Sequence, residues 1–588
     1  MEGGSRRLLA GVIVALAVGA LLRGAWLTAD PPTFTPVGII WHDEGAWVHN
    51  ARNRALWGTW RTDEWNPVFV APVFTGLEYA AFRAFGVGTW QARTVPLVSG
   101  LLAVAAMAFG LSAVTGRRSA LIGACLLATN YVFVMWNRAA LMESTMTAFI
   151  VGAWAAYALA ARRPVWGLMA GTLATLAWFS KAAAAFFVAS LVLDALLTLT
   201  LARAGGLRRT LGIPAPTPAS IRAAGATLVG LGLSAAVIVA LFVLPNWTEY
   251  RFYNWQMSVM RKPSYTIGAL LDRASWLPIV QDIFTRMWVV LVAASLATVG
   301  IVARWRTAVP AERLLVLWLV VGLVELIVHD AGNERRYVML IPALIGLAAM
   351  VVGSPGSLIG LATGPQRWLA LPLVLSLAYL VIGSLLRMAF LPEVRAGNLQ
   401  LSVRMSALGA AAVGTLIVWK WGAIADWLSR QAISARGAAV LVALVVLGDL
   451  GQYAQWATYR TKLNYRASIE VGRLLPPGTL VHGKLANGLA LENRIRPVFV
   501  GRGFGNYQDR KTRDDVRYIL TYTSPYLGYE GRVIRDVVEA YPQRAIIATF
   551  DVAETATGHD QAALIDKFGA LTTTVRTPGP SPRPLLPQ

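Results

Sequence analysis

Long apolar segments recur along most of this 588-residue chain, and each is close to the length of a membrane-spanning helix. A helix needs about 20 consecutive, mostly apolar residues to cross the hydrocarbon core of a bilayer. The chain is 56% hydrophobic and only 14% charged, which is typical of a protein that crosses the membrane many times. The predicted fold class is therefore mostly α, a polytopic membrane protein. We expect about thirteen spans, near residues 8–28, 93–115, 119–136, 142–161, 165–180, 183–203, 223–245, 286–304, 312–330, 337–353, 367–390, 405–420 and 437–455.

Arginines in the short loops indicate how the chain is threaded through the membrane. If the N-terminus is cytoplasmic, the short loops on that side are basic, as at Arg117, Arg118, Arg162 and Arg163. Cytoplasmic loops carry an excess of Lys and Arg, so this orientation is the expected one. The bias is partial, because two long loops on the other side also contain arginines. Thirteen spans then place the first long loop, residues 29–92, and the C-terminal part outside the cytoplasm.

The net charge of +22 is explained by these loops, which fit topology signals and anionic lipid headgroups better than a nucleic acid. Cys125 is the one cysteine of the chain, so disulfides and cysteine-rich metal sites are excluded. The first apolar segment, from about Leu8 to Leu27, is longer than the ~7–15 residues of a signal-peptide core. We interpret it as a retained anchor. The expected location is the plasma or inner membrane.

The chain divides into three parts. Residues 1–455 form the predicted transmembrane catalytic domain, and its first long loop contains interfacial helices near 43–57 and 70–86. In the first of these helices Asp43 is an acceptable N-cap, and Gly58 is a stop signal. Residues 456–575 form a small extracytoplasmic α/β domain, and residues 576–588, rich in Pro and Arg, are expected to be disordered.

The α/β domain is predicted from short segments with strand-like composition. TLVHGK, RPVFVG, VRYILTY and RAIIATFDV read as strands, and helices are expected near Ser468–Leu475 and Asp560–Phe568. Its size of roughly 130 residues is usual for one domain.

Three carboxylates lie where spans meet the outer boundary. Asp43 and Glu44 follow the first span after a short loop, and Glu143 lies at a tight turn between two spans. An ionisable group at the edge of a span is costly unless it is paired or functional. The alternatives are helix capping by Asp43 and a pair between Glu143 and Arg138.

Cations occur at the same boundary. Lys181 stands nearly alone between two apolar runs, and Arg335 and Arg336 precede another span. Arg and Lys at this level suit a lipid phosphate, because they form charge-assisted hydrogen bonds with it. The alternatives are snorkelling of Lys181 to the interface and pairing of the arginines with Glu334 and Asp330.

A metal site is less well indicated. The histidines at 42, 49, 329 and 482 are too scattered for a His-based site. A divalent metal ion held by Asp43 and Glu143 with waters stays open, and no cofactor is certain.

Acids that activate a nucleophile and cations that hold a phosphate thus lie on one face of the membrane. Nucleotide sugars are not supplied outside the cytoplasm, so group transfer there commonly uses lipid-phosphate carriers. The segments WHDEGAWVHNARNRALWGTW, NRAALMESTMTAF, LAWFSKAAAAFF and ERRYVMLIPAL, in this order, resemble the integral-membrane glycosyltransferases of the C superfamily. The similar branch contains the protein O-mannosyltransferases and the aminoarabinose-to-lipid A transferases, and the resemblance covers about residues 8–345.

The resemblance implies transfer of a sugar from a polyprenyl-phosphate carrier, usually with inversion at the anomeric centre. It implies that Asp43 is the catalytic acid-base residue and that Lys181 and Arg336 handle the carrier phosphate. The aminoarabinose branch has a Phe-Glu-Lys-Pro-Pro pattern where this chain reads Phe69-Val70-Ala71-Pro72. The charged Glu-Lys pair is thus missing from this chain. The resemblance therefore extends to the general chemistry and not to the aminoarabinose donor or the lipid A acceptor. The predicted catalytic residues are Asp43, Glu44 and Glu143, and the predicted donor phosphate-binding residues are Lys181, Arg335, Arg336, Tyr337 and Arg138.

The predicted function is a hexosyl- or pentosyltransferase with a polyprenyl-phosphate sugar donor and a lipid, glycan or protein acceptor. Two other classes remain. In a transporter or lipid flippase we expect charged or helix-breaking residues in the middle of several spans, whereas most spans of this chain have no charged residue there. A scaffold subunit that recruits partners through its C-terminal part has no need for Asp43.

Overall fold

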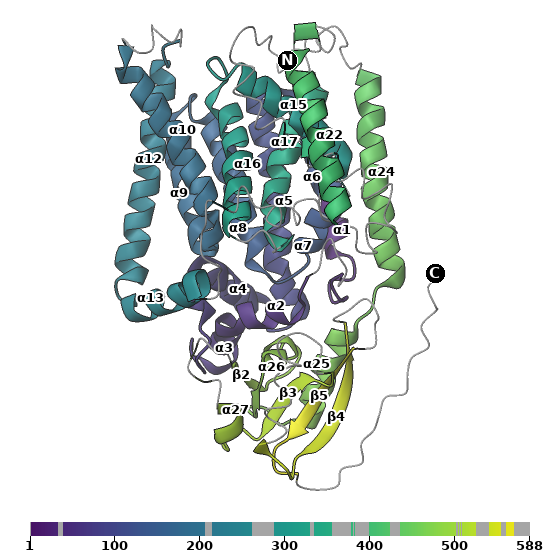
Figure 1. Ribbon diagram of the computed structural model, residues 1–588. Coiled ribbons are helices and arrows are strands. Elements are labelled where there is room, and N and C mark those ends of the chain that lie inside the picture. The colour runs from purple at the N-terminus through teal and green to yellow at the C-terminus, as the bar shows by residue number, and fades with distance from the viewer. Residues whose placement is uncertain are drawn as a thin grey trace.

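The computed structural model describes residues 2–32, 39–205, 214–260, 287–329, 334–354, 399–420, 435–500, 509–524, 540–553 and 560–569, with a few isolated positions between these ranges. A bundle of long helices forms most of this part, and a small sheet lies beyond one end of the bundle (Figure 1). The predicted span at 367–390 and the predicted disordered tail at 576–588 fall almost wholly outside the described residues.

The bundle is built from helices that lie at the predicted spans, with one exception described below. The bundle helices are α1 (Glu2–Gly24), α5 (Thr89–Val114), α6 (Arg117–Thr129), α7 (Tyr131–Trp136), α8 (Met142–Leu159), α9 (Pro164–Ser180), α10 (Ala185–Arg203), α12 (Pro218–Ile238), α15 (Trp288–Ala303), α16 (Pro310–His329), α17 (Ile341–Gly353), α22 (Leu399–Trp419) and α24 (Ala435–Tyr459). Short irregular helical segments precede or continue some of them, namely η2 (Ala182–Ala184), η3 (Val239–Val243) and η7 (Glu334–Leu340), and η4 (Gln256–Met260) continues α13 of the second long loop.

One predicted span is two helices. The segment 119–136 breaks at Asn130, whose φ of −51° and ψ of 115° are not helical. The Asn130 side chain accepts a hydrogen bond from the backbone N–H of Phe133 and so caps α7. Asn is among the preferred capping residues, which explains why the helix restarts at this position.

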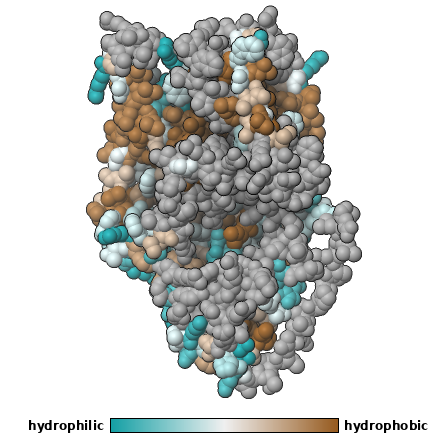
Figure 2. All heavy atoms as spheres, viewed as in Figure 1, coloured by the Kyte–Doolittle hydropathy of each residue, from teal (hydrophilic) through white to brown (hydrophobic). Residues whose placement is uncertain are grey.

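By length and composition, five helices in the described part qualify as candidate membrane spans: Arg6–Gly24, Thr89–Val114, Ala182–Arg203, Pro218–Val243 and the helical run Arg436–Leu474. Shorter apolar helices accompany them. Figure 2 shows hydrophobic residues over the bundle and more hydrophilic residues toward the end that carries the sheet. The chain is a mostly helical membrane protein, and the number of thirteen spans stays a prediction.

The first long loop, residues 29–92, forms short helices at the end of the bundle that faces the sheet (Figure 1). They are α2 (His42–Trp47), α3 (His49–Trp57), η1 (Pro67–Phe69) and α4 (Pro72–Phe85). The predicted helix 43–57 is therefore broken at Val48. Gly58 ends α3 with a φ of 74°, as predicted, because glycine adopts this left-handed conformation without strain. A second long loop begins with α13 (Trp247–Trp255).

The interpretation of Asp43 as an N-cap is wrong. Asp43 lies inside the first turn of α2, and the N-cap position is Trp41, which makes no side-chain capping bond. The carboxylate is therefore directed to other partners, described below.

Residues 463–569, here called the C-terminal unit, contain a five-stranded mixed sheet in the order β2-β1-β3-β5-β4. Strands β1 (Leu480–His482), β2 (Arg496–Val498), β3 (Tyr518–Tyr522) and β4 (Ala545–Val552) lie within the predicted segments. Helices α25 (Leu463–Leu474), α26 (Lys484–Gly488) and α27 (Asp509–Thr512) accompany the sheet, and α25 matches the helix predicted near Ser468. Helix α24 extends to Tyr459, beyond the predicted boundary at 456.

The helix predicted at Asp560–Phe568 is wrong. Residues Asp560–Asp566 form strand β5, which pairs antiparallel with β3 on one side and β4 on the other. The segment is buried between two strands, and this packing overrides its local helical preference.

Candidate active site between the helical bundle and the C-terminal unit

Two neighbouring carboxylates of α2 bind cations from different parts of the chain. Asp43 Oδ1 lies 2.8 Å from Nζ of Lys484 in α26. Glu44 binds Arg93 of α5 through two parallel hydrogen bonds of 2.7 and 2.6 Å. Successive residues of a helix point about 100° apart, so the two acids face different neighbours. Both are buried, with 6% and 4% of their surface exposed.

Glu44 joins three elements of the fold. Besides Arg93, its Oε1 accepts a hydrogen bond of 2.7 Å from the backbone N–H of Ala140, in the turn before α8. Arg93 in turn donates to the carbonyls of Leu27 and Ala29. A buried charge pair with this many hydrogen bonds holds its helices together, and breaking it leaves a buried charge unpaired. The arrangement gives Glu44 a structural task, and its predicted catalytic role stays a prediction.

Glu143 is paired with Lys181. Glu143 lies in the first turn of α8, and Lys181 follows the last residue of α9, so the pair joins the ends of two bundle helices. The side chains are 3% and 10% exposed. Snorkelling of Lys181 to the interface is therefore the wrong interpretation, since its ammonium group is buried and bound to a carboxylate.

Arg138 does not pair with Glu143 as the alternative reading proposed. Its guanidinium donates to the carbonyls of Leu22, Arg23 and Trp26 at the end of α1, at 2.8 to 2.9 Å. It also lies 4.5 Å from the ring centre of Trp456 in α24. These contacts place Arg138 between α1 and α24, and its predicted role in phosphate binding stays a prediction.

The remaining predicted phosphate-binding residues lie in η7. Tyr337 is buried, with 1% of its surface exposed. The side chains of Arg335 and Arg336 are outside the described residues, although their backbone belongs to η7. Pairing of these arginines with Glu334 or Asp330 also lies outside the described part.

Lys484 is a site residue that the sequence alone did not reveal. Helix α26 packs directly against α2, and glycines allow the close approach. A Cβ atom on Gly45 would lie 1.9 Å from the carbonyl oxygen of Asn487, and one on Gly488 would lie 2.7 Å from Cβ of His42. Any larger residue at either position must push the two helices apart. The one local signal is the sequence GKLANG, in which glycines flank the lysine.

Buried polar contacts hold the C-terminal unit to the first loop on both sides of this helix pair. The guanidinium of Arg52 donates to the carbonyls of Ala490, Asn493 and Ile495 at 2.9 to 3.1 Å. Arg52 is 1% exposed, and burial lowers its pKa to about 9. On the other side, Glu492 accepts a bond of 2.6 Å from the backbone N–H of Thr89.

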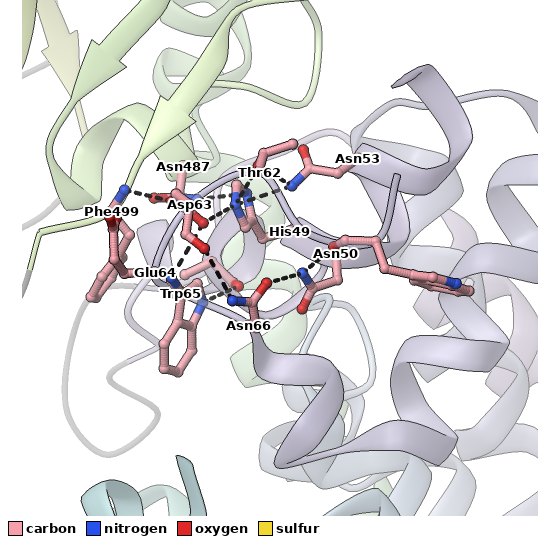
Figure 3. Close-up of polar contacts among 12 residues, drawn as sticks. His49, Asn50, Asn53, Thr62, Asp63, Glu64, Trp65, Asn66, Asn487 and Phe499 are labelled. Carbon is pink, nitrogen blue, oxygen red and sulfur yellow. Dashed lines mark hydrogen bonds and ion pairs between the residues drawn. The ribbon is translucent and has the colours of Figure 1, made fainter. Parts of the chain in front are cut away.

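Figure 3 shows a second buried network between the same two parts. His49 Nε2 lies 2.9 Å from Oδ1 of Asp63, and His49 Nδ1 lies 3.0 Å from Nδ2 of Asn487. The other oxygen of Asp63 accepts a bond of 2.7 Å from the backbone N–H of Phe499. Both ring nitrogens of His49 are thus bound, which fixes the imidazole between the first loop and the C-terminal unit.

Glu78 of α4 is the one carboxylate of the described residues with both oxygens buried and without a hydrogen-bond partner. Burial raises its pKa well above the ordinary value of 4.5, and the nearby charge of Glu44 raises it further. The sequence offers no signal for this group, because Glu78 lies among apolar residues in a segment of ordinary amphipathic pattern.

Among the described residues, no group of three or more His, Cys, Asp or Glu side chains lies close enough to hold a metal ion. The two candidate ligands, Asp43 and Glu143, are each bound to a lysine. Among the described residues, the groups around these two acids therefore do not form the donor set of a metal centre.

A small cavity beside α2 is lined by Asp30, Glu44 and Arg93, together with residues of the C-terminal unit. Its volume of about 20 Å³ is close to that of a single water. This cavity is too small to hold a sugar.

Solved structures similar to the chain include three of low sequence identity. ArnT from Cupriavidus metallidurans, bound to undecaprenyl phosphate, is 18% identical with a TM-score of 0.47, over 95% of this chain and 98% of that chain. The oligosaccharyltransferase AglB from Archaeoglobus fulgidus is 13% identical with a TM-score of 0.46, over 96% and 75%. The arabinofuranosyltransferase AftD from Mycobacteria is 13% identical with a TM-score of 0.39, over 96% and 40%. Comparison with curated proteins finds no match.

Residues 70–211 match a family model described as dolichyl-phosphate-mannose-protein mannosyltransferase. The matched segment runs from α4 to the end of α10 and contains Glu143 and Lys181, whereas Asp43 lies before it. The match confirms the resemblance to membrane glycosyltransferases that the order of the sequence motifs predicted.

Proposed function

We propose that this protein is a glycosyltransferase that moves a sugar from a polyprenyl-phosphate carrier to a hydroxyl group outside the cytoplasm. The observation that carries the proposal is the bond of 2.7 Å from the backbone N–H of Ala140 to Glu44. It places α2, with Asp43, against the turn that leads into α8. The first turn of α8 carries Glu143, which is bound to Lys181. Acids and a cation from distant segments therefore meet at one end of the bundle.

In the proposed reaction the acceptor hydroxyl attacks the anomeric carbon of the sugar, and the bond from this carbon to the carrier phosphate breaks. The hydroxyl proton passes to the Asp43 carboxylate, and the phosphate leaves with the bonding electron pair as polyprenyl phosphate. Direct displacement of this kind inverts the anomeric centre. A positioned general base commonly accelerates such a step by about 10²–10⁴-fold.

Asp43 is the proposed base because its neighbour Glu44 is occupied on both oxygens. A base must come within hydrogen-bond reach of the proton that it accepts. Glu44 Oε1 and Oε2 are both bound by Arg93, and Oε1 also by the backbone of Ala140. Glu143 is bound to Lys181 and is proposed to line the same site.

Cations beside the acids are proposed to hold the carrier phosphate. The leaving group is an anion, and its charge must be stabilised as the bond breaks. Lys181 is buried among the bundle helices and is the best-placed cation of the described residues. The proposed phosphate-binding set keeps the sequence-based members Lys181, Arg335, Arg336, Tyr337 and Arg138.

The proposed orientation has the N-terminus in the cytoplasm and the C-terminal unit outside, in a plasma or inner membrane. The basic short loops support it. A reporter fused after Gln588 that is active only in the cytoplasm would contradict this orientation.

The acceptor is proposed to approach beside the C-terminal unit, which covers α2 and carries the lysine bound to Asp43. Lipid, glycan and protein acceptors all provide the required hydroxyl. A flippase without catalytic activity does not need a carboxylate base at this position. It is the alternative function if no polyprenyl phosphate is released in the assay below.

The direct experiment uses the purified protein with a panel of polyprenyl-phosphate sugars and measures released polyprenyl phosphate. We expect release with one donor class and its loss in the Asp43→Asn variant. Equal release from the parent and the variant would contradict the assignment of the base. No release with any donor and acceptor would favour the flippase.

A further inference from the structure

We propose that Lys484 positions the Asp43 carboxylate for proton transfer, so that the C-terminal unit completes the active site instead of only covering it. This inference rests on the proposed role of Asp43 as the base. Lys484 does not touch the substrate in this proposal, and it acts through Asp43 as a positioning residue. Its ammonium group lies 2.8 Å from Oδ1 of Asp43, at ion-pair distance.

The backbone around Lys484 is held in place, unlike that of an ordinary surface lysine. Lys484 is the first residue of α26 and follows strand β1 through Gly483, whose φ of 118° is favourable only for glycine. The N–H of Gly483 donates to the carbonyl of Val498 at the end of β2, at a distance of 3.1 Å. The sheet therefore determines where the lysine side chain begins.

The helix that carries Asp43 is held against the same unit. The close approach at Gly45 and Gly488 leaves α2 and α26 no room for extra side-chain atoms. The three carbonyl bonds of Arg52 hold the chain that follows α26 against α3. Because both backbones are held, the Lys484–Asp43 pair has little freedom to change its geometry.

The ion pair also suits a base better than the neighbouring pair does. Arg93 binds Glu44 through a planar fork that occupies both carboxylate oxygens. A lysine is a point charge without this fork, and the ammonium group of Lys484 contacts Oδ1 of Asp43. Such a contact restrains the rotation of the carboxylate.

A second contact of the C-terminal unit reaches the same turn of α2. The hydroxyl of Tyr522 in β3 lies 3.4 Å from Nδ1 of His42, and His42 Nε2 lies 4.0 Å from Oδ1 of Asp43. The C-terminal unit thus approaches the turn that carries the carboxylate with two side chains from different elements. Lys484 is the one that makes direct contact with Asp43.

The test is a double-mutant cycle with Lys484→Gln, Asp43→Asn and the combined variant in the full-length protein. Single-turnover release of polyprenyl phosphate is measured at saturating donor. A misplacement of a reacting group by 1 Å can cost about 10²-fold, so we expect Lys484→Gln to lower turnover by about 10- to 100-fold with donor KM within about twofold. Lys484→Arg keeps the charge but presents a planar fork to the carboxylate, so it should recover only part of the turnover.

The decisive readout is non-additivity. If Lys484 acts through Asp43, Lys484→Gln should change the residual turnover of Asp43→Asn by less than about twofold, because the group it positions is gone. A purely structural role predicts the same factor in both backgrounds. Glu492→Gln is the matched control, since it weakens another contact of the C-terminal unit without touching Asp43. It should leave turnover near that of the parent.

Four results would overturn the inference. If the turnover of Lys484→Gln equals that of the parent, Lys484 has no role in the site. If Lys484→Gln lowers turnover by the same factor in the parent and in the Asp43→Asn variant, its role is purely structural. If Lys484→Gln is poorly folded, Lys484→Arg takes its place in the cycle, and an equal loss of turnover with and without Asp43→Asn contradicts a role through Asp43. If the turnover of Asp43→Asn itself equals that of the parent, Asp43 is not the base, and this inference fails with it. The Asp43→Asn variant alone thus separates failure of the proposed base from failure of the role proposed for Lys484.

Discussion

Both ends of the helical bundle contain buried carboxylate–arginine pairs, and among the described residues buried carboxylate–lysine pairs occur at the end near the sheet. At the end away from the sheet, Arg313 of α16 binds Asp194 of α10, with 2.7 Å from Nε to Oδ1. Tyr157 of α8 donates to the other oxygen of the same carboxylate at 2.7 Å. At the end near the sheet, Asp43 binds a lysine through Oδ1, and Glu78 has no hydrogen-bond partner among the described residues.

The difference separates structural charges from those suited to chemistry. The Asp194 carboxylate is bound by an arginine fork and a phenol, so it fixes three helices and offers nothing to a substrate. Lysine pairs and an unpaired acid lie instead where the bundle meets the C-terminal unit. A buried charge alone therefore does not indicate a functional site. Whether the carboxylate is bound by an arginine fork or by a lysine is the more informative feature.

Matched Asp→Asn changes at the two ends should have opposite effects. Asp43→Asn should lower turnover by about 10²–10⁴-fold while leaving the unfolding temperature near that of the parent. Asp194→Asn leaves Arg313 without its carboxylate and should destabilise the protein by about 3–5 kcal/mol, with unchanged turnover of the folded fraction. Released polyprenyl phosphate and thermal unfolding in detergent measure the two effects.

The reverse pattern would break the comparison. If Asp43→Asn keeps most of its turnover while Glu44→Gln or Glu143→Gln loses it, the base is the other carboxylate.

The Glu143–Lys181 pair tests whether one interaction serves both structure and chemistry. Glu143→Gln or Lys181→Met alone leaves a buried charge unpaired and should cost about 3–5 kcal/mol of stability. The double variant removes both charges and should recover most of that loss. Its donor affinity should still be low, because the cation proposed to bind the carrier phosphate is absent. A double variant with the donor affinity of the parent would exclude Lys181 from the phosphate site.

Arg52 tests how strongly the C-terminal unit is held. Arg52→Ala leaves three carbonyl oxygens without their donor, at about 1–3 kcal/mol for each buried group that stays unsatisfied. We expect faster proteolysis between α24 and α25 and a lower unfolding temperature. Arg473→Ala is the control, because its exposed pair with Glu470 should be worth at most about 1 kcal/mol. Equal protease resistance of both variants would mean that the unit is held by other contacts.

Glu78 should have the smallest effect, and its sign depends on pH. Its raised pKa means that the folded protein keeps a proton above pH 4.5, where the unfolded chain has released it. The folded state then binds more protons, so this group lowers stability as the pH rises from 4.5 toward its folded pKa. Glu78→Gln should remove that decline and raise the unfolding temperature at pH 7, with a smaller difference at pH 4. The exposed Glu470→Gln should show no such trend, and a Glu78→Gln curve parallel to that of the parent would contradict the buried neutral acid.

The sequence predicted the helices of the bundle because their apolar length is a local property. It also predicted that Asp43 lies at the end of the bundle, since the distance along the chain from the first span is short. The break at Asn130 was missed because the capping bond to Phe133 outweighs a continuous apolar run. The strand β5 was missed because its neighbours β3 and β4 come from elsewhere in the chain.

The partners of the acids were the least predictable part of the site. A pair between Glu143 and Arg138, five residues away, was one of the interpretations, yet Glu143 binds Lys181 at the end of another helix. Lys484 lies in a different part of the chain from Asp43, and only the packing of α26 on α2 brings them together. Local patterns identify which residues are charged at a boundary, and tertiary packing decides which charges meet.

The contact between Arg52 and Ala490 joins residues that are 438 positions apart. Ribosomes add about 5–20 residues per second, so this separation corresponds to roughly 20–90 s of synthesis. During that time α2 and α3 have left the ribosome, while the sheet against which they pack does not yet exist. A chain released early therefore lacks Lys484 and carries an exposed Arg52, which makes the first loop of an unfinished protein both incomplete as a site and accessible to proteases.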